Sequence, residues 1–187
     1  MPHITSPLIS PTWLEQRRLA ALPPTQTLDW LFDEGSLTRR LTALSENAFS
    51  VLPLFEGWQT LRPDECAGLE LPENSEGWVR EVYLCGRGQP WVFARSVAAK
   101  SSLEGGGLNM DELGTRSLGE LLFSDQAFER GELQVCHYPS DALPLADRAD
   151  NLWARRSCFV RGALSVLVAE VFLPHLWAAL KARSENT

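Results

Sequence analysis

The sequence predicts an α+β protein built on an antiparallel sheet. Two pairs of segments rich in β-branched and aromatic residues are each joined by a short glycine-containing turn, which is typical of β-hairpins. Helix-like segments precede the first hairpin, and another lies between the two hairpins. Helices and strands therefore do not alternate as they do in parallel βαβ folds, and the hairpins favour the α+β class.

The composition is that of an ordinary soluble globular protein, with 44% hydrophobic and 22% charged residues among 187. We expect a single domain over residues 1–187. The net charge of −7 argues against a nucleic-acid partner but not against an anionic small molecule. No apolar run approaches the length of a membrane span, and the N-terminus lacks the pattern of a secretory signal. These features predict a cytoplasmic protein that does not insert into membranes, and nothing in the pattern demands more than a monomer.

The cysteines and histidines are too scattered to form a metal site or a disulfide framework. We expect free thiols and no metal. The four cysteines are Cys66, Cys85, Cys136 and Cys158.

The N-terminal third predicts mostly helices. Residues 1–12 are rich in Pro and Ser, so we expect them to be loosely ordered. Residues 13–21 and 27–33 are candidates for short helices, and the second ends near Gly35. Ser36 then looks like the N-cap of a third helix, whose apolar positions are Leu37, Leu41 and Leu44.

Extended and loop segments follow. Residues 48–54 alternate like a strand, and residues 57–61 are a candidate partner strand. Residues 62–76 are rich in Pro, Glu and Gly and predict a loop. Residues 101–107 predict a glycine-rich loop that lacks the features of a phosphate-binding motif.

The first hairpin consists of residues 78–85 and 90–99, joined by the turn over residues 86–89. A two- or four-residue turn would place Arg80 opposite Arg95 on one apolar face of the sheet. Two like charges directly opposite each other are unfavourable unless an anion lies between them or each finds its own carboxylate. The pair therefore predicts a buried site for a ligand with a carboxylate. The alternative is that each arginine pairs with Glu81, Glu104 or another acid.

The second half of the chain continues this pattern. Ser117 and Glu120 form a capping box that opens a short helix. Residues 128–138 look like another strand. Residues 139–151 form a long polar loop, long enough to be a functional lid.

The second hairpin joins residues 155–161 to residues 164–173 through Gly162 and Ala163. A two-residue turn places Arg155 opposite Glu170, which is the one carboxylate in an otherwise apolar run. An ion pair between the strands is the simpler interpretation. The functional alternative is a carboxylate in a pocket, where its surroundings tune its acidity.

Seven stretches of the sequence, in order, resemble the chorismate lyase family of ubiquinone biosynthesis. They extend from Leu28 to Pro174, so the resemblance covers most of the chain. The stretches are Leu28-Asp-Trp-Leu31, Gly35-Ser-Leu-Thr-Arg-Arg-Leu41, Trp78-Val-Arg-Glu-Val-Tyr-Leu-Cys85, Pro90-Trp-Val-Phe-Ala-Arg95, Ser117-Leu-Gly-Glu-Leu-Leu-Phe123, Leu152-Trp-Ala-Arg-Arg-Ser157 and Ala169-Glu-Val-Phe-Leu-Pro174.

This resemblance implies a single antiparallel sheet flanked by helices, with an enclosed internal site, and it implies roles for particular residues. Arg80 would bind the carboxylate of the aromatic product, and Arg95 would be a second basic residue of the site. Glu170 would lie near the product hydroxyl, as base or as orienter. Leu118 would contact the ligand through its backbone, and Leu37 stands where the family often has Met.

The resemblance also implies an activity: elimination of pyruvate from chorismate to give 4-hydroxybenzoate, without a cofactor. The same fold is similar to the effector-sensing domains of some bacterial transcription regulators. The rival prediction is therefore a non-catalytic module that binds a small aromatic acid. Two departures concern the loop over residues 139–151, which is longer than expected, and residues 94–107, which lack an expected Pro.

Overall fold

The computed structural model describes residues 10–106, 114–125 and 128–185. The strands are β1 (Leu14–Glu15), β2 (Phe49–Thr60), β3 (Glu76–Gly86), β4 (Gln89–Ala99), β5 (Glu129–Arg130), β6 (Gln134–His137), β7 (Trp153–Arg161) and β8 (Leu164–Phe172). The helices are α1 (Thr25–Leu31), α2 (Leu37–Leu44), α3 (Pro63–Gly68), α4 (Lys100–Gly106), α5 (Leu118–Ser124) and α6 (Pro174–Glu185).

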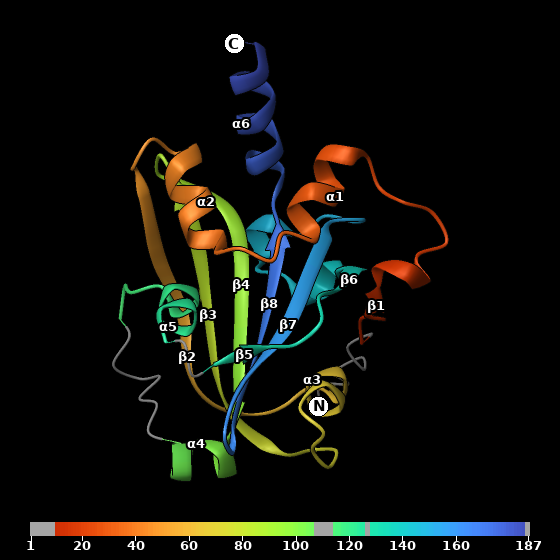
Figure 1. Ribbon diagram of the computed structural model, residues 1–187, viewed down its shortest axis with the longest axis vertical. Coiled ribbons are helices and arrows are strands. Elements are labelled where there is room, and N and C mark those ends of the chain that lie inside the picture. Colours follow the sequence, from red (N-terminus) through yellow and green to blue (C-terminus); the bar gives the residue numbers. More distant parts are fainter. Residues whose placement is uncertain (1–9, 107–113, 126–127, 186–187) are drawn as a thin grey trace, which may run out of the picture.

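The strands form one eight-stranded sheet in the order β1-β6-β7-β8-β4-β3-β2, with β5 paired to β7 (Figure 1). Every pairing in it is antiparallel. The predicted α+β class and the single antiparallel sheet are therefore confirmed. Among the described residues, none of the helices is both long enough and apolar enough to cross a membrane.

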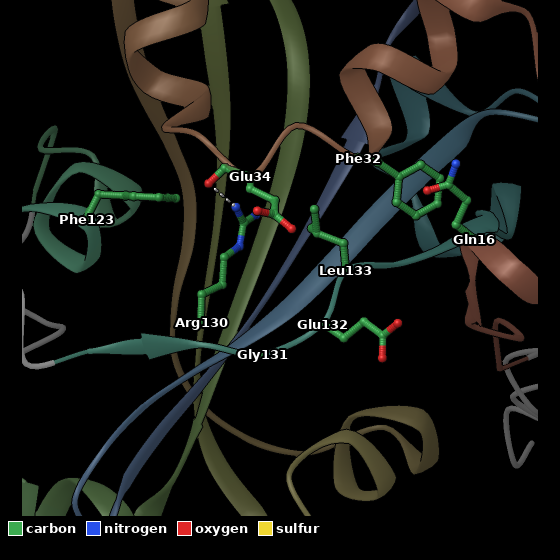
Figure 2. A pocket seen from close by; sticks show the side chains of 8 residues that line it. All are labelled: Gln16, Phe32, Glu34, Phe123, Arg130, Gly131, Glu132 and Leu133. Atoms are coloured by element: carbon green, nitrogen blue, oxygen red, sulfur yellow. Dashed lines mark hydrogen bonds between the residues drawn. The ribbon is translucent and has the colours of Figure 1, made fainter.

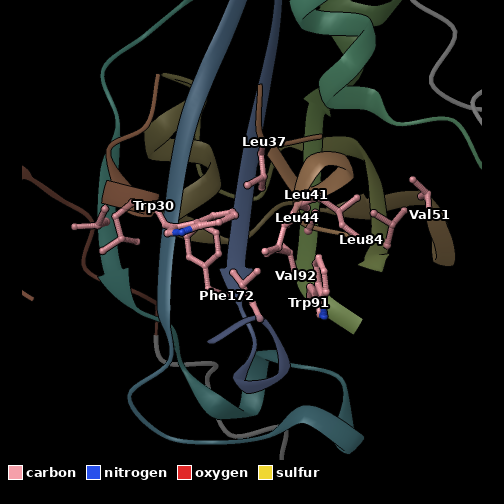
Figure 3. Packing of buried hydrophobic residues seen from close by; sticks show 14 residues of the cluster. Trp30, Leu37, Leu41, Leu44, Val51, Leu84, Trp91, Val92 and Phe172 are labelled. Carbon is pink, nitrogen blue, oxygen red and sulfur yellow. The ribbon is translucent and has the colours of Figure 1, made fainter. Parts of the chain in front are cut away.

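Helices α1, α2 and α5 pack on one face of the sheet, which we call the α2 face. The apolar stripe of α2, with Leu37 and Leu41, is buried as its spacing predicts, and Ser36 caps the helix as expected. Figure 3 shows these leucines with Trp30 and Phe172 in the larger of two apolar clusters on this face. A second cluster forms around α5 and the far ends of β7 and β8.

The opposite face, which we call the α3 face, is covered by α3 and by residues 139–151. This segment was predicted to be a long loop, and two short 3₁₀ turns interrupt it, Ser140–Ala142 and Leu145–Asp147. Its Leu143 belongs to a buried cluster with Phe93 and Val171, so the segment is packed against the sheet.

Four predictions of secondary structure were wrong. Residues 13–21 form β1 and a short 3₁₀ turn because Leu14 pairs with Val135 at the edge of the sheet. Residues 48–54 and 57–61 do not pair with each other; both belong to β2, which pairs with β3 along its whole length. A shift of register at Pro53 suits an edge strand, since proline has no N–H to donate.

The other two errors are helices that were predicted as loops. Helix α3 lies within residues 62–76. It begins at Pro63, a favourable first helical residue, and the Glu65 carboxylate accepts a hydrogen bond from the Arg62 backbone N–H (2.9 Å). Helix α4 covers most of residues 101–107, and its Leu103 packs on the cluster around α5. Gly107 lies outside the described residues, as do residues 1–9 of the segment expected to be loosely ordered.

The C-terminal half agrees better with the predictions. The Ser117 hydroxyl accepts a hydrogen bond from the Glu120 N–H and caps α5 (3.2 Å). Residues 128–138 form two strands, β5 and β6, where one was expected. The register of the second hairpin is confirmed, with Arg155 directly opposite Glu170.

The register of the first hairpin differs from the prediction by one residue. Gly86 pairs with Gln89 and Cys85 with Pro90, but Leu84 then pairs with Val92, so Trp91 is an extra, bulged residue. Trp91 is buried in the same apolar cluster as Val92. This burial fits the bulge, since consecutive residues of a regular strand would point to opposite faces.

Candidate functional site

The candidate site lies on the α2 face, between the two apolar clusters. The strand register places side chains of β3, β4, β8 and β7 in two adjacent rows across this face. The first row is Arg80, Ser96, Val168 and Ser157, and the second is Val82, Ala94, Glu170 and Arg155. Strand β4 contributes only the small side chains of Ser96 and Ala94. The rows therefore form a shallow floor with charged groups on both sides.

Arg80 is at the β3 side of this floor and is only 2% exposed. Its Nε donates to the Glu56 carboxylate (2.7 Å), and its Nη2 donates to the backbone carbonyls of Gly114 (2.6 Å) and Arg116 (3.0 Å). Among the described residues, Nη1 makes no hydrogen bond. A buried guanidinium with donors to spare is suited to a carboxylate ligand.

Glu170 and Arg155 occupy the other side of the floor. The Arg155 Nε donates to Oε2 of Glu170 (2.7 Å), and the Arg155 Nη1 donates to the backbone carbonyls of Trp30 (3.1 Å) and Asp33 (2.8 Å). The ion pair predicted from the hairpin is therefore present. It also holds the chain segment between α1 and α2 against the sheet.

Arg130 is a further cation on this face, and no pattern in the sequence singles it out. Its Nε donates to the Ser157 hydroxyl (2.8 Å), and its Nη1 donates to the Glu34 carbonyl (3.1 Å). Burial lowers the pKa of Arg130, and the nearby positive charge of Arg155 lowers it further. In Figure 2, Arg130 lies at the centre of a pocket of about 410 Å³, between Phe123 and Leu133.

The roof of the site is formed by the first turns of α2 and α5. Leu37 and Leu118 are the first residues of these helices, and both are buried. The hydroxyl groups of Thr38 and Ser117 lie 2.7 Å apart and share a hydrogen bond, which joins the two helices directly above the sheet. Apolar side chains from both helices therefore shield the polar floor from water.

Arg95 is not part of this arrangement, so its predicted position opposite Arg80 was wrong. The bulge at Trp91 shifts the register, and Arg80 pairs with Ser96 while Arg95 pairs with Glu81. Because neighbouring residues of a strand point to opposite faces, Arg95 points to the α3 face. There its Nε donates to Glu65 (2.5 Å) and its Nη1 donates to Glu81 (2.8 Å).

The carboxylates around Arg95 stabilise its charge. Burial alone would lower its pKa, but hydrogen bonds and charge attraction from Glu65, and then from Glu81, raise it above the ordinary arginine value. The structure therefore shows the alternative interpretation of Arg95, in which it pairs with acids such as Glu81. The other acid considered, Glu104, does not pair with Arg95.

The sequence of the chain matches the profile of the chorismate lyase family over residues 8–182. A protein of Pseudomonas fluorescens (strain Pf0-1) named "Probable chorismate pyruvate-lyase 2" is 68% identical over 186 residues, which is 100% of both chains. A "Probable chorismate pyruvate-lyase" of Pseudomonas aeruginosa (strain UCBPP-PA14) is 68% identical over 165 residues, which is 88% of this chain and 92% of the relative.

Solved structures of more distant proteins share the fold. A possible transcriptional regulator from Bacillus subtilis superposes with a TM-score of 0.50 at 12% identity, over 88% of each chain. A protein from Streptomyces coelicolor described as a "putative transcriptional regulator" gives a TM-score of 0.50 at 14% identity, over 67% of this chain and 87% of the other. At these identities the likeness concerns the fold alone.

Proposed function

The chain belongs to the chorismate lyase family, and we propose that it eliminates pyruvate from chorismate to give 4-hydroxybenzoate. The observation that carries the proposal is the position of Arg80 and Glu170 in adjacent rows of one sheet face. The two residues lie two strands apart across the sheet and are offset by two residues along it, so their Cα atoms are about 12 Å apart. With both side chains pointing to the same face, this separation suits a six-membered ring with a carboxylate at one end and a hydroxyl at the other.

The reaction places simple demands on a protein. Chorismate carries a ring carboxylate at C1, an enolpyruvyl ether at C3 and a hydroxyl at C4. Loss of the C4 proton and cleavage of the C3–O bond make the ring aromatic, and the departing enolpyruvate takes up a proton to become pyruvate. Aromatisation drives the reaction, so the proposal includes no cofactor. The protein must bind and orient chorismate, and it must accept the C4 proton.

We assign Arg80 to the ring carboxylate, because its Nη1 donors have no hydrogen-bond partner among the described residues. Glu170 then faces C4 and its hydroxyl, with Arg155 fixing the carboxylate through Oε2. Leu37 and Leu118 cover the ring, and the backbone of Leu118 contacts the bound acid. The Arg95 side chain, 5% exposed on the α3 face, has no part in this proposal.

We further propose that the protein works as a cytoplasmic monomer on the route to ubiquinone, with chorismate as substrate and no nucleic-acid partner. The net charge of −7 supports the last point, because nucleic acids bind to positively charged surfaces.

The test is whether the purified protein converts chorismate to the expected products. Purified protein is incubated with chorismate without added metals or nucleotides, and the products are separated by chromatography. Equal amounts of 4-hydroxybenzoate and pyruvate, formed faster than in the absence of protein, are the expected result. Tight binding of 4-hydroxybenzoate without turnover would instead support the non-catalytic binding module.

A further inference from the structure

Arg130, which is half-buried, differs from the buried arginines of the sheet in one respect. Four arginines that project from β3, β4 and β7 each lie within 4 Å of a carboxylate: Arg80 with Glu56, Arg95 with Glu65, Arg155 with Glu170 and Arg156 with Asp64. Arg130 forms no such ion pair within residues 10–106, 114–125 and 128–185. Its hydrogen bonds go to a hydroxyl and a backbone carbonyl, which carry no full negative charge.

The surroundings of Arg130 leave its charge poorly balanced. Its guanidinium lies 5.3 Å from the ring centre of Phe123 and 5.4 Å from that of Phe159. These rings replace water on one side. Burial together with the charge of Arg155 lowers its pKa, and the more weakly acting charges of Glu170, Asp33 and Glu34 offset this only in part. A protein rarely keeps a half-buried cation without an anion, since the desolvation of a charge is costly. An anionic ligand would supply the missing charge.

Arg130 is also close to the proposed position of the substrate. Its anchor, Ser157, lies in the same row of side chains as Arg80, and Ser157 is next but one to Arg155 on β7. A ring held between Arg80 and Glu170 would point the C3 substituent beyond β8 towards β7. Arg130 lies on this side, close enough to Glu170 and Arg155 for their charges to act on it, and it lines a pocket with Phe32, Glu34 and Leu133.

We propose that Arg130 binds the carboxylate of the enolpyruvyl side chain of chorismate. This inference rests on the proposed function and adds to it a residue that distinguishes substrate from product. Chorismate has two carboxylates, and 4-hydroxybenzoate keeps only the one on the ring. Arg80 therefore contacts both molecules, whereas Arg130 contacts chorismate alone. Glu34 and Glu132 also line the pocket, so the attraction of Arg130 for a carboxylate must exceed their repulsion.

The test compares substrate and product in the same variants. Arg130→Gln should raise the KM for chorismate by about 10- to 100-fold, the equivalent of one lost hydrogen bond between charged groups. The inhibition constant of 4-hydroxybenzoate in this variant should stay within about twofold of its value in the unaltered protein. Arg130→Lys, which keeps the charge, should recover part of the loss. Arg87→Gln is the matched control, since Arg87 is exposed and pairs with Glu46 outside the site.

Two results would overturn the inference. An unchanged KM for chorismate in Arg130→Gln would show that Arg130 does not contact the enolpyruvyl carboxylate. An equal weakening of chorismate and 4-hydroxybenzoate would mean that Arg130 only supports the site. If Arg130→Gln does not fold, Arg130→Lys gives the comparison, with a smaller expected rise in the KM for chorismate and again no change in the inhibition constant of 4-hydroxybenzoate. Failure of the unaltered protein to convert chorismate would contradict the proposed function itself, so the two failures are distinguishable.

Discussion

Arg80 and Arg95 lie on adjacent strands, and their side chains leave the sheet on opposite faces. Arg80 is aligned with Ser96 on the α2 face, and Arg95 is aligned with Glu81 on the α3 face. The two arginines thus belong to separate buried polar groups, one on each side of a single sheet. Within the part of the chain that the structure describes, the α2 face combines Arg80, an arginine with spare donors, and the Glu170 carboxylate. The two arginines should therefore respond to mutation in different ways.

Removing Arg80 should abolish tight binding of the aromatic acid. Arg80→Gln should raise the Kd of 4-hydroxybenzoate by at least about tenfold, because a hydrogen bond between charged groups is lost. Isothermal titration calorimetry measures this directly. Glu56→Gln is the control, since it alters the partner of Arg80 and keeps the arginine. An unchanged Kd in Arg80→Gln would contradict its role in binding the carboxylate.

Glu170 should matter for turnover more than for binding. Glu170→Gln keeps the shape of the side chain but cannot accept a proton, so kcat should fall by about 10²- to 10⁴-fold. Steady-state kinetics with chorismate measures this fall. Arg155 loses its ionised partner in this variant, so thermal unfolding is used to check that the variant stays folded. A kcat near that of the unaltered protein would remove Glu170 from the mechanism.

Arg95 should matter for stability and not for catalysis. Arg95→Met leaves Glu65 buried without its cation, which should cost about 3–5 kcal/mol of unfolding free energy. Urea denaturation measures the loss, and kinetics on the folded protein should give KM and kcat within about twofold of the original. A large kinetic change with unaltered stability would show that Arg95 reaches the site after all.

The bulge in the first hairpin depends on Gly86. A Cβ atom added to Gly86 would lie 2.2 Å from the buried ring of Trp91, so the ring would have to move. Gly86→Ala should therefore destabilise the protein by about 1–3 kcal/mol, measured by urea denaturation. In Gly119→Ala, the matched control, the nearest side-chain atoms are at an ordinary 3.6 Å. Equal stability of both variants would contradict the packing described for Trp91.

Asp33 should make the fold sensitive to acid. Burial tends to raise its pKa, but hydrogen bonds from the Gly35 N–H and from Arg40 hold the pKa below the usual 3.8. A lowered pKa in the folded state stabilises the protein above the unfolded pKa, and this contribution is lost as the pH falls through the folded value. Asp33→Asn should cost a few tenths to about 1 kcal/mol at pH 7.

The measurement is urea denaturation of both proteins between pH 7 and pH 2. The difference between the unaltered protein and Asp33→Asn should shrink as the pH falls, because the protonated Asp33 resembles the amide. A difference that stays constant over this range would mean that the charge of Asp33 does not contribute to stability.

The fold could be predicted from the sequence where local signals agree with the final packing. Ser36 and the leucine spacing of α2 determine that helix, and the two-residue turn at Gly162 determines the register that joins Arg155 to Glu170. The predicted register of the first hairpin was wrong because its bulge depends on the burial of Trp91, which contacts distant parts of the chain.

The candidate site was predictable only in part for a similar reason. Arg80 and Glu170 stand out as charges within apolar strands, and the family resemblance points to the same residues. Arg130 lies in a polar segment, and its partners Ser157 and Glu34 are far from it in sequence. No local pattern marks such a residue, so only the folded structure reveals it.

The most direct test of the proposed site is a crystal structure of the protein with 4-hydroxybenzoate bound. We expect the ligand on the α2 face, with its carboxylate within hydrogen-bond distance of Arg80 and its hydroxyl beside Glu170. A ligand bound on the α3 face beside Arg95, or one on the α2 face that touches neither Arg80 nor Glu170, would contradict it.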